Sequence, residues 1–242
     1  MSKTAIVTGG GYGIGRATTR LLAEAGWSVV VFDRDHDRAL ETQRLVREAG
    51  GTCEVIAGDV TDAAAVQRAA DWTAATFDRI DGLVNNAASR HVGNILQITE
   101  QQWDETVAVV MKGPFLFAKA VIPHMIAAGG GAIVNVSSGD AFGRKNMIPY
   151  AAAKGAINTL TLCLAADHLE DHIRVNAVIP GFTVTGMTEH YPAERLADVG
   201  RRAVAARPGQ PEDMGFLIRF LLSDEAATIT GGLFGGLPLA VR

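Results

Sequence analysis

Short apolar runs rich in β-branched residues alternate along the chain with longer segments of helical periodicity. The runs are apolar at consecutive positions, which is typical of parallel strands covered on both faces. They are TAIVT near Ala5, SVVVFD ending at Asp33, CEVIAGD ending at Asp59, GLVNN ending at Asn86, AIVNVSS ending at Ser138 and IRVNAVIP ending at Pro180. Between them lie segments such as AAAVQRAADWTAATF and AINTLTLCLAADHLE. This order predicts an α/β fold, a doubly wound parallel sheet of Rossmann type with helices on both faces.

The chain shows no linker, repeat or low-complexity tract that would divide it, so we expect one domain over residues 1–242. AAGGGAIV, from Ala127 to Val134, is interpreted as a helix stop before the next strand. The segment 183–207 differs from the rest because prolines, glycines and charges interrupt it. We interpret this segment as a lid over the substrate.

Composition excludes several classes of partner. Lysine and arginine number 22 against 26 aspartate and glutamate, a net charge of −4 without basic runs, which indicates neither nucleic acid nor an anionic membrane. Cys53 and Cys163 form no CxxC or Cys/His cluster, so we expect no disulfide framework and no metal site. The first predicted strand begins within a few residues of Met1, and the apolar runs are far shorter than the ~20 residues of a membrane span. A cytoplasmic protein with a small-molecule partner is expected.

A glycine-rich loop, TGGGYGIGRA, connects the first predicted strand to a helix. Gly9, Gly13 and Gly15 have the spacing G-x-x-x-G-x-G, a variant of the dinucleotide-binding pattern. Small residues here let the backbone turn tightly and approach a pyrophosphate at the positive end of the helix. A purely structural βα turn is the alternative interpretation.

Asp33 ends the second predicted strand about 20 residues beyond the loop, where an acid accepts hydrogen bonds from an adenosine ribose. A carboxylate at this place repels a 2′-phosphate, which favours NAD over NADP. Arg34 works against this preference because its guanidinium tolerates the phosphate. Asp33 could instead cap the next helix, but Asp35 lies closer to that helix start.

PYAAAK, from Pro149 to Lys154, places a tyrosine and a lysine four residues apart just after a proline. If Pro149 begins a helix, Tyr150 and Lys154 share one face with Cβ atoms about 5–6 Å apart. The same spacing occurs in ordinary amphipathic pairs. A tyrosine that acts as a base near neutral pH needs its pKa lowered by roughly three units, or about 4 kcal/mol. An ammonium about 4 Å away supplies an effect on that scale.

Four further motifs accompany the glycine loop and the PYAAAK segment. They are DV at Asp59 and Val60, NNAA at Asn85 to Ala88, NVSS ending at Ser138, and PG at Pro180 and Gly181. In this the chain resembles the short-chain dehydrogenase/reductase family over nearly its whole length. The resemblance implies a single Rossmann-type domain, commonly assembled as a homotetramer. It also implies hydride transfer between NAD(P) and an alcohol or carbonyl carbon.

The resemblance further implies roles for individual residues. Tyr150 would give and take the proton, Lys154 would activate it, and Ser138 would donate a hydrogen bond to the substrate oxygen. The implied cofactor-binding set is Gly9, Gly13, Ile14, Gly15, Asp33, Arg34, Asp59, Val60, Asn86, Ala87, Ala88, Tyr150, Lys154, Pro180, Gly181, Thr183 and Thr185. Within it, Asp59 and Val60 would border the adenine, Asn86 and Ala87 the cofactor channel, and Thr183 and Thr185 the nicotinamide amide.

Three places depart from the family's pattern. Ala88 stands where the family has glycine, and Val110 aligns with the family's catalytic asparagine. The ending GGLFGGLPLAVR also differs from the usual one. We expect a local helix irregularity at Val110 to expose a main-chain carbonyl, so that a water can still link the lysine to solvent.

Two alternatives to an alcohol dehydrogenase or ketone reductase are kept open. One is a dinucleotide-binding sensor or subunit with weak or no catalysis, and the other is an NAD-using epimerase or dehydratase. The expected substrate wall is polar, and Arg90, His91 and Arg144 favour a polar or anionic substrate. Its remaining members would be Asp140, Phe142, Asn146, Met147, Phe182 and His190.

Overall fold

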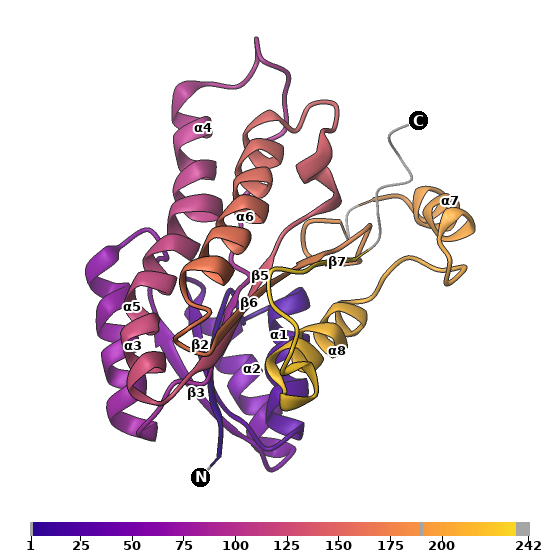
Figure 1. The fold of residues 1–242 in the computed structure, drawn as a ribbon. Coiled ribbons are helices and arrows are strands. Elements are labelled where there is room, and N and C mark those ends of the chain that lie inside the picture. Colours follow the sequence, from indigo (N-terminus) through magenta and orange to yellow (C-terminus); the bar gives the residue numbers. More distant parts are fainter. Residues whose placement is uncertain (1, 189–190, 236–242) are drawn as a thin grey trace.

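A parallel sheet of seven strands forms the centre of the computed structural model, which describes residues 2–188 and 191–235 (Figure 1). The strand order is β3-β2-β1-β4-β5-β6-β7, and each neighbouring pair is parallel. The strands are β1 (Thr4–Thr8), β2 (Ser28–Asp33), β3 (Thr52–Ala57), β4 (Gly82–Asn85), β5 (Gly131–Val136), β6 (Ile173–Ile179) and β7 (Leu233–Gly235). The first six correspond to the six predicted runs. β7 was not predicted, because three residues are too few to show a strand pattern.

Helices cover both faces of this sheet, so the predicted doubly wound fold is confirmed. One face carries α1 (Gly13–Glu24), α2 (His36–Glu48) and α8 (Pro211–Leu222). The other face carries α3 (Ala63–Phe77), α5 (Gly113–Ala127) and α6 (Ile148–Asp167). Two further helices, α4 (Glu100–Val107) and α7 (Ala193–Arg202), lie toward the carboxyl edge of the strands.

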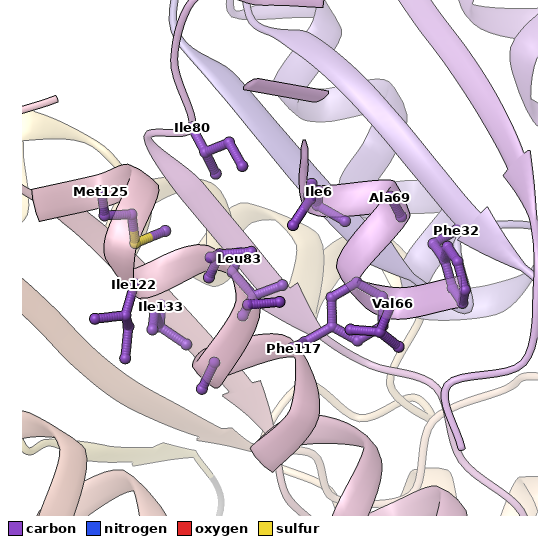
Figure 2. Close-up of a cluster of buried hydrophobic side chains, with 14 of the residues drawn as sticks. Ile6, Phe32, Val66, Ala69, Ile80, Leu83, Phe117, Ile122, Met125 and Ile133 are labelled. Carbon is purple, nitrogen blue, oxygen red and sulfur yellow. The ribbon is translucent and has the colours of Figure 1, made fainter. Parts of the chain in front are cut away.

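The core follows the alternation of side chains along each strand. Ile6 and Phe32 face α3 and α5, where Phe32 meets Phe117 edge-on with ring centroids 5.0 Å apart (Figure 2). Val7 and Val31 point to the opposite face and pack with the residues of α1 and α8. Because both faces are buried, the strands are apolar at nearly every position, as the sequence pattern indicated.

α8 packs along α1 although nearly 200 residues separate them in the chain. Gly215 makes this close approach possible, because a Cβ there would lie 2.7 Å from the Leu21 side chain. Leu22 of α1 and Ile218 of α8 are both fully buried in the shared core. The first and last helices of the fold therefore complete one hydrophobic cluster.

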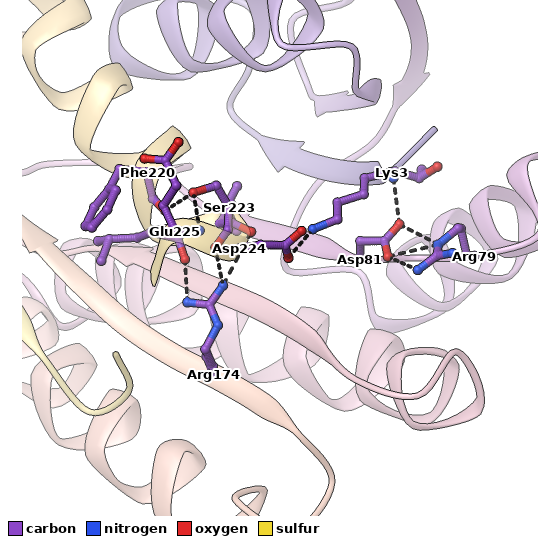
Figure 3. A network of polar contacts seen from close by, with 11 residues as sticks. Lys3, Arg79, Asp81, Arg174, Phe220, Ser223, Asp224 and Glu225 are labelled. Atoms are coloured by element: carbon purple, nitrogen blue, oxygen red, sulfur yellow. Dashed lines mark hydrogen bonds and ion pairs between the residues drawn. The ribbon is translucent and has the colours of Figure 1, made fainter. Parts of the chain in front are cut away.

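Polar contacts close the amino edge of the sheet beside α8 (Figure 3). The Arg174 guanidinium donates to the carbonyls of Leu221 (2.7 Å) and Ser223 (3.0 Å) at the end of α8. The Thr4 amide donates to Asp81 at 2.8 Å, so the start of β1 is tied to the residue preceding β4. The Arg174 bonds satisfy carbonyl groups that the end of a helix leaves without intrahelical partners.

Two predictions about helix ends hold. Asp35 rather than Asp33 caps α2, because its carboxylate accepts from the Arg38 amide at 3.1 Å. Gly129 and Gly130 follow α5 with φ of 86° and 134°, as expected for a helix stop. These positive φ values favour glycine.

The helix that runs from α4 into α5 is interrupted by a π-helical turn, Ala108–Lys112, which contains Val110. This is the expected irregularity. Over Glu100–Ala127 the combined helix is long and apolar enough to cross a membrane by length and composition, yet half of its most apolar window is buried inside the protein. That burial is typical of a core helix.

Candidate functional site

A groove of about 1400 Å³ follows the carboxyl edge of the strands, where the order reverses between β1 and β4. Ligands bind at this switch point in open α/β sheets. Of the predicted site residues it is lined by Gly9, Gly13, Ile14, Asp33, Arg34, Asp59, Val60, Asn86, Ala87, Ala88, Ser138, Tyr150, Lys154, Pro180, Gly181, Thr183 and Thr185. Gly15 is the exception and does not line the groove.

The glycine loop needs small residues for two different reasons. Gly9 has φ of 63°, and a Cβ there would lie 2.9 Å from Ala87 Cα, so the end of β1 presses directly on the segment after β4. Gly15 lies under the loop, where a Cβ would be 2.1 Å from the Gly9 carbonyl oxygen. Gly15 therefore serves helix packing, and its predicted contact with a cofactor is indirect.

The amino end of α1 opens onto the groove. Its N-cap residue, Tyr12, makes no side-chain cap hydrogen bond, so the first amides of α1 are not capped by that side chain. Free amides at a helix start, together with the helix dipole, suit an anion such as a pyrophosphate. Gly13, with φ of 55°, begins this helix and lines the groove. The residues present thus fit a dinucleotide at this end.

Asp33 lines the groove at the end of β2, the place expected for an adenosine ribose, and is held there by backbone donors. Its two carboxylate oxygens accept from the amides of Gly11 and Asp35, each at 2.9 Å. Arg34 and Arg38 line the same end, and Arg38 pairs with Asp35 at 3.2 Å. A fixed carboxylate with arginines beside it is the arrangement that the sequence indicated.

The floor of the groove is organised by Thr8 and Asn86. The Asn86 side-chain amide donates to the carbonyls of Thr8 and Gly9, each at 3.0 Å, and the Thr8 hydroxyl accepts from the amides of Asn86 and Ala87 at 2.9 and 3.1 Å. β1 and β4 are thereby locked together where their carboxyl ends meet. Sequence reasoning missed Thr8, although it immediately precedes the glycine loop.

Asp59 is engaged locally, because its carboxylate accepts from the amide and hydroxyl of Thr61 at 2.8 and 2.7 Å. Val60 beside it is buried and packs in the core under α5. Both residues line the groove after β3, as expected for the adenine end. Val60 contributes an apolar surface to this wall, and Asp59 contributes a carboxylate held by Thr61.

Ser138, Tyr150 and Lys154 come together at the other end of the groove. Ser138 follows β5, and the other two lie one turn apart near the start of α6. All three side chains line the groove, and the Ser138 side chain favours the ionised form of Tyr150 by lowering its pKa. The Lys154 ammonium lies 5.6 Å from the Tyr150 ring centroid and donates to the Val136 carbonyl.

Burial has the largest effect on the pKa values of Tyr150 and Lys154. It raises the pKa of Tyr150 to about 12, against the effect of the Ser138 side chain, which lowers it. It also lowers the pKa of Lys154 to about 7. Lys154 is not among the groups that shift the Tyr150 pKa here, because its ammonium is directed at the Val136 carbonyl. The lowering of that pKa by the lysine together with a positively charged nicotinamide stays a prediction.

Two departures from the family's pattern meet behind the tyrosine. Val110, on the π-helical turn, packs in one cluster with Met147, Tyr150 and Ala153, and Ala88 packs against that cluster. Val110 is 1% exposed. Sequence positions far apart thus form a single apolar wall against the Tyr150 ring.

The segment predicted as a lid borders the groove. Its base is closed by a bridge in which the Val184 amide donates to Gly209 at 2.9 Å and the Gly209 amide donates to Phe182 at 3.0 Å. Met187 belongs to this segment, and its carbonyl accepts a hydrogen bond from the Arg90 guanidinium at 2.9 Å. The mobility of the segment stays a prediction, and residues 189–190 lie outside the described part of the chain.

The predicted substrate wall is partly correct. Arg90, Asp140, Arg144 and Phe182 line the groove. His91 pairs with Glu105 at 3.0 Å, and neither it nor Phe142, Asn146 or Met147 lines the groove. His190 lies outside the described residues. Within the described ranges no group of three or more His, Cys, Asp or Glu side chains has the arrangement of a metal site.

Comparison with known proteins gives a consistent result. The family model described as short chain dehydrogenase matches residues 3–196. A probable short-chain type dehydrogenase/reductase of Bradyrhizobium diazoefficiens is 42% identical over 235 residues, covering 95% of this chain and 84% of that protein. A 3-oxoacyl-[acyl-carrier-protein] reductase of Thermotoga maritima is 36% identical over 98% of both chains. The crystal structure of a putative short-chain dehydrogenase/reductase from Burkholderia xenovorans is 34% identical, with a TM-score of 0.92 over 99% of this chain and 97% of that one.

Proposed function

The chain belongs to the short-chain dehydrogenase/reductase family, and from this premise we propose that it is an NAD-dependent oxidoreductase of secondary alcohols and their ketones. Members of the family use a nicotinamide cofactor. The observation that carries the proposal is the meeting of Ser138, Tyr150 and Lys154 on the wall of one groove that also includes the glycine loop, with Tyr150 and Lys154 one turn apart on α6.

Each of the three residues has a distinct task in this proposal. The Ser138 hydroxyl donates to the substrate oxygen and orients it. The Tyr150 hydroxyl gives a proton to that oxygen in reduction or takes it in oxidation. When bound, the nicotinamide ring supplies or accepts the hydride. Lys154, as a buried amine with a pKa of about 7, exchanges protons near neutral pH and supports the charge changes at Tyr150.

The preference for NAD is supported by Asp33. Its carboxylate is fixed by two backbone amides, so it stays where a 2′-phosphate would have to lie. The repulsion between this carboxylate and the 2′-phosphate disfavours NADP. Arg34 and Arg38 are exposed, and Arg38 is engaged by Asp35, so their attraction for a phosphate is weakened.

A homotetramer in the cytoplasm completes the proposal. The helices around residues 100–126 and 149–170 present apolar side chains to solvent, with Phe115 and Leu162 49% and 47% exposed. Gly155 and Ala156 add small side chains to the same helix as Leu162, and these suit close approach of a symmetric partner.

The decisive experiment is Tyr150→Phe, assayed for NADH formation with a panel of alcohols, sugars and hydroxy acids. We expect turnover to disappear while NAD affinity, measured by calorimetry, changes little, because only one hydroxyl is removed from a packed helix. Near-normal kcat in this variant would leave a dinucleotide-binding protein with weak or no catalysis as the better interpretation.

A further inference from the structure

The cations that line the groove differ in their exposure. Among residues 2–188 and 191–235 the arginines on its wall are Arg34, Arg38, Arg90, Arg144, Arg195, Arg202 and Arg207. Arg90 is half-buried, whereas the other six are exposed to solvent. A cation that has lost part of its hydration needs compensation from a partner of opposite charge.

Arg90 also differs from these arginines in its partners. Four of the others have a carboxylate partner and a fifth lies over an aromatic ring: Arg38 with Asp35 (3.2 Å), Arg144 with Asp140 (3.1 Å), Arg202 with Asp198 (3.2 Å), Arg207 with Asp213 (2.7 Å), and Arg195 over Tyr191 (3.9 Å). Arg34 is exposed and lies beside Asp33, at the adenosine end. Arg90 makes one hydrogen bond, to the Met187 carbonyl, and in the described part of the chain no carboxylate lies within 4.0 Å of it.

The unused donors of Arg90 suit one kind of ligand group. A guanidinium has five N–H donors in a planar fork, and the bond to Met187 engages one of its terminal nitrogens. The remaining donors match the two oxygens of a carboxylate, which is the arrangement of the strongest charge-assisted hydrogen bonds in proteins.

Arg90 lies at the reacting end of the groove. It follows β4, and Ser138 and Asp140 follow β5, the next strand of the sheet. Its charge acts on the Tyr150 hydroxyl and lowers the tyrosine's pKa, although burial raises it more. Asp140 acts on the same hydroxyl in the opposite direction and more strongly, but its carboxylate is already paired with Arg144 at 3.1 Å. Arg90 therefore offers a substrate beside Tyr150 a cation that no carboxylate of the described residues pairs with.

We propose that Arg90 binds the carboxylate of the substrate, and that the substrate is a short-chain hydroxy acid or the corresponding oxo acid. This assignment of substrate class rests on the proposed oxidoreductase function. In the oxidation, the carbinol carbon gives its hydride to the nicotinamide and the hydroxyl gives its proton to Tyr150, so the product is an oxo acid with its carboxylate unchanged. Since Arg90 also donates to the Met187 carbonyl, the bound acid would lie beside Met187.

Matched substrates test this assignment. We expect wild-type kcat/KM for 3-hydroxybutanoate or 2-hydroxybutanoate to exceed that for the corresponding methyl ester by roughly 100-fold. Arg90→Met should lower kcat/KM for the acid by about the same factor, mainly through KM, and change the ester less than about threefold. Arg90→Lys, which keeps the charge but loses the fork, should recover part of the loss. Equal use of acids and esters by the wild type, or an equal loss of both in Arg90→Met, would overturn it.

A binding measurement separates this inference from the proposed function. Butanoate has a carboxylate but no hydroxyl, so its affinity for the NADH-loaded protein can be measured by calorimetry without turnover. We expect Arg90→Met to weaken butanoate at least about tenfold, and Arg195→Met, a change of an exposed groove arginine, to leave it unaltered. Unchanged butanoate affinity in Arg90→Met would refute the carboxylate site whatever the turnover. Arg90-dependent butanoate binding without oxidation of any alcohol would instead refute the oxidoreductase function and, with it, the substrate class.

Discussion

Burial of the Lys154 ammonium should lower the free energy of unfolding by a measurable amount. Its pKa falls from 10.5 to about 7 because burial disfavours the ammonium. At 1.36 kcal/mol for each pH unit, this corresponds to about 5 kcal/mol of lost stability for the charged form. The ammonium recovers part of this through its hydrogen bond to Val136, and such charged bonds contribute about 1.5–3 kcal/mol. Lys154→Met should therefore stabilise the cofactor-free protein by roughly 2–3 kcal/mol near pH 6.5.

The sign of the pH dependence follows from proton uptake. Between pH 7 and 10.5 the unfolded chain binds a proton at this lysine that the folded chain has already released, so wild-type stability rises with pH in this window. The difference in the free energy of unfolding between Lys154→Met and wild type should therefore decrease by about 2–3 kcal/mol between pH 6.5 and pH 9. Burial also raises the pKa values of Cys53 and Tyr150 to about 12, which lowers stability at high pH. Both groups are present in both proteins, so their effects cancel in the difference.

Urea unfolding of wild type and variant at one protein concentration, at several values between pH 6.5 and pH 9, measures this difference. Lys119→Met is a matched control, because Lys119 is exposed on α5 and its removal should change stability little at any pH. If Lys154→Met is no more stable than wild type at pH 6.5, or if its advantage does not depend on pH, the burial argument for Lys154 fails.

Three further predictions concern the cofactor, the assembly and the π-helical turn. Asp33→Ala should narrow the preference for NAD over NADP, and equal affinities of the two in the wild type, measured by calorimetry, would contradict the role of this carboxylate. Light scattering should show a tetramer that Phe115→Glu or Leu162→Glu breaks into smaller species, and a wild-type monomer at micromolar concentration would exclude the assembly. Val110→Asn should leave kcat unchanged or raise it severalfold, far less than the roughly 10²–10⁴-fold worth of full general acid–base catalysis, with any gain confined to steps sensitive to solvent deuterium. A large loss of kcat would argue against a water-linked lysine.

Much of the fold could be predicted because its information is local. The six longer strands are apolar on both faces, and each is followed by a helical period, so their type and order are visible in the sequence. The spacing of the glycine loop and of the tyrosine and lysine of α6 singled these residues out, and the resemblance to the family gave them their expected roles. β7 carries only three residues, and its pairing with β6 depends on tertiary contacts.

The parts of the site that were missed depend on residues far apart in the chain. Ala88 and Val110 were noted as separate departures, but only the structure brings them into one cluster with Tyr150. The bond from Arg90 to Met187 joins residues 97 positions apart. Sequence spacing gives the separation of Tyr150 and Lys154 along the helix. It gives neither the direction of the Lys154 ammonium nor the burial that raises the Tyr150 pKa.

The pairing of α1 with α8 has a consequence for synthesis on the ribosome. β1, at the centre of the sheet, and α1 leave the exit tunnel first, while Ile218 and its neighbours on α8 follow only after roughly 200 more residues. Until then the side of α1 that contacts Gly215 of α8, which includes Leu21, lacks its partner. The early chain must therefore remain bound to a chaperone or collapse loosely, and the cooperative folding step waits for α8. A chain terminated before Pro211 would keep this surface exposed, so premature termination late in the message should yield aggregates rather than a smaller folded protein.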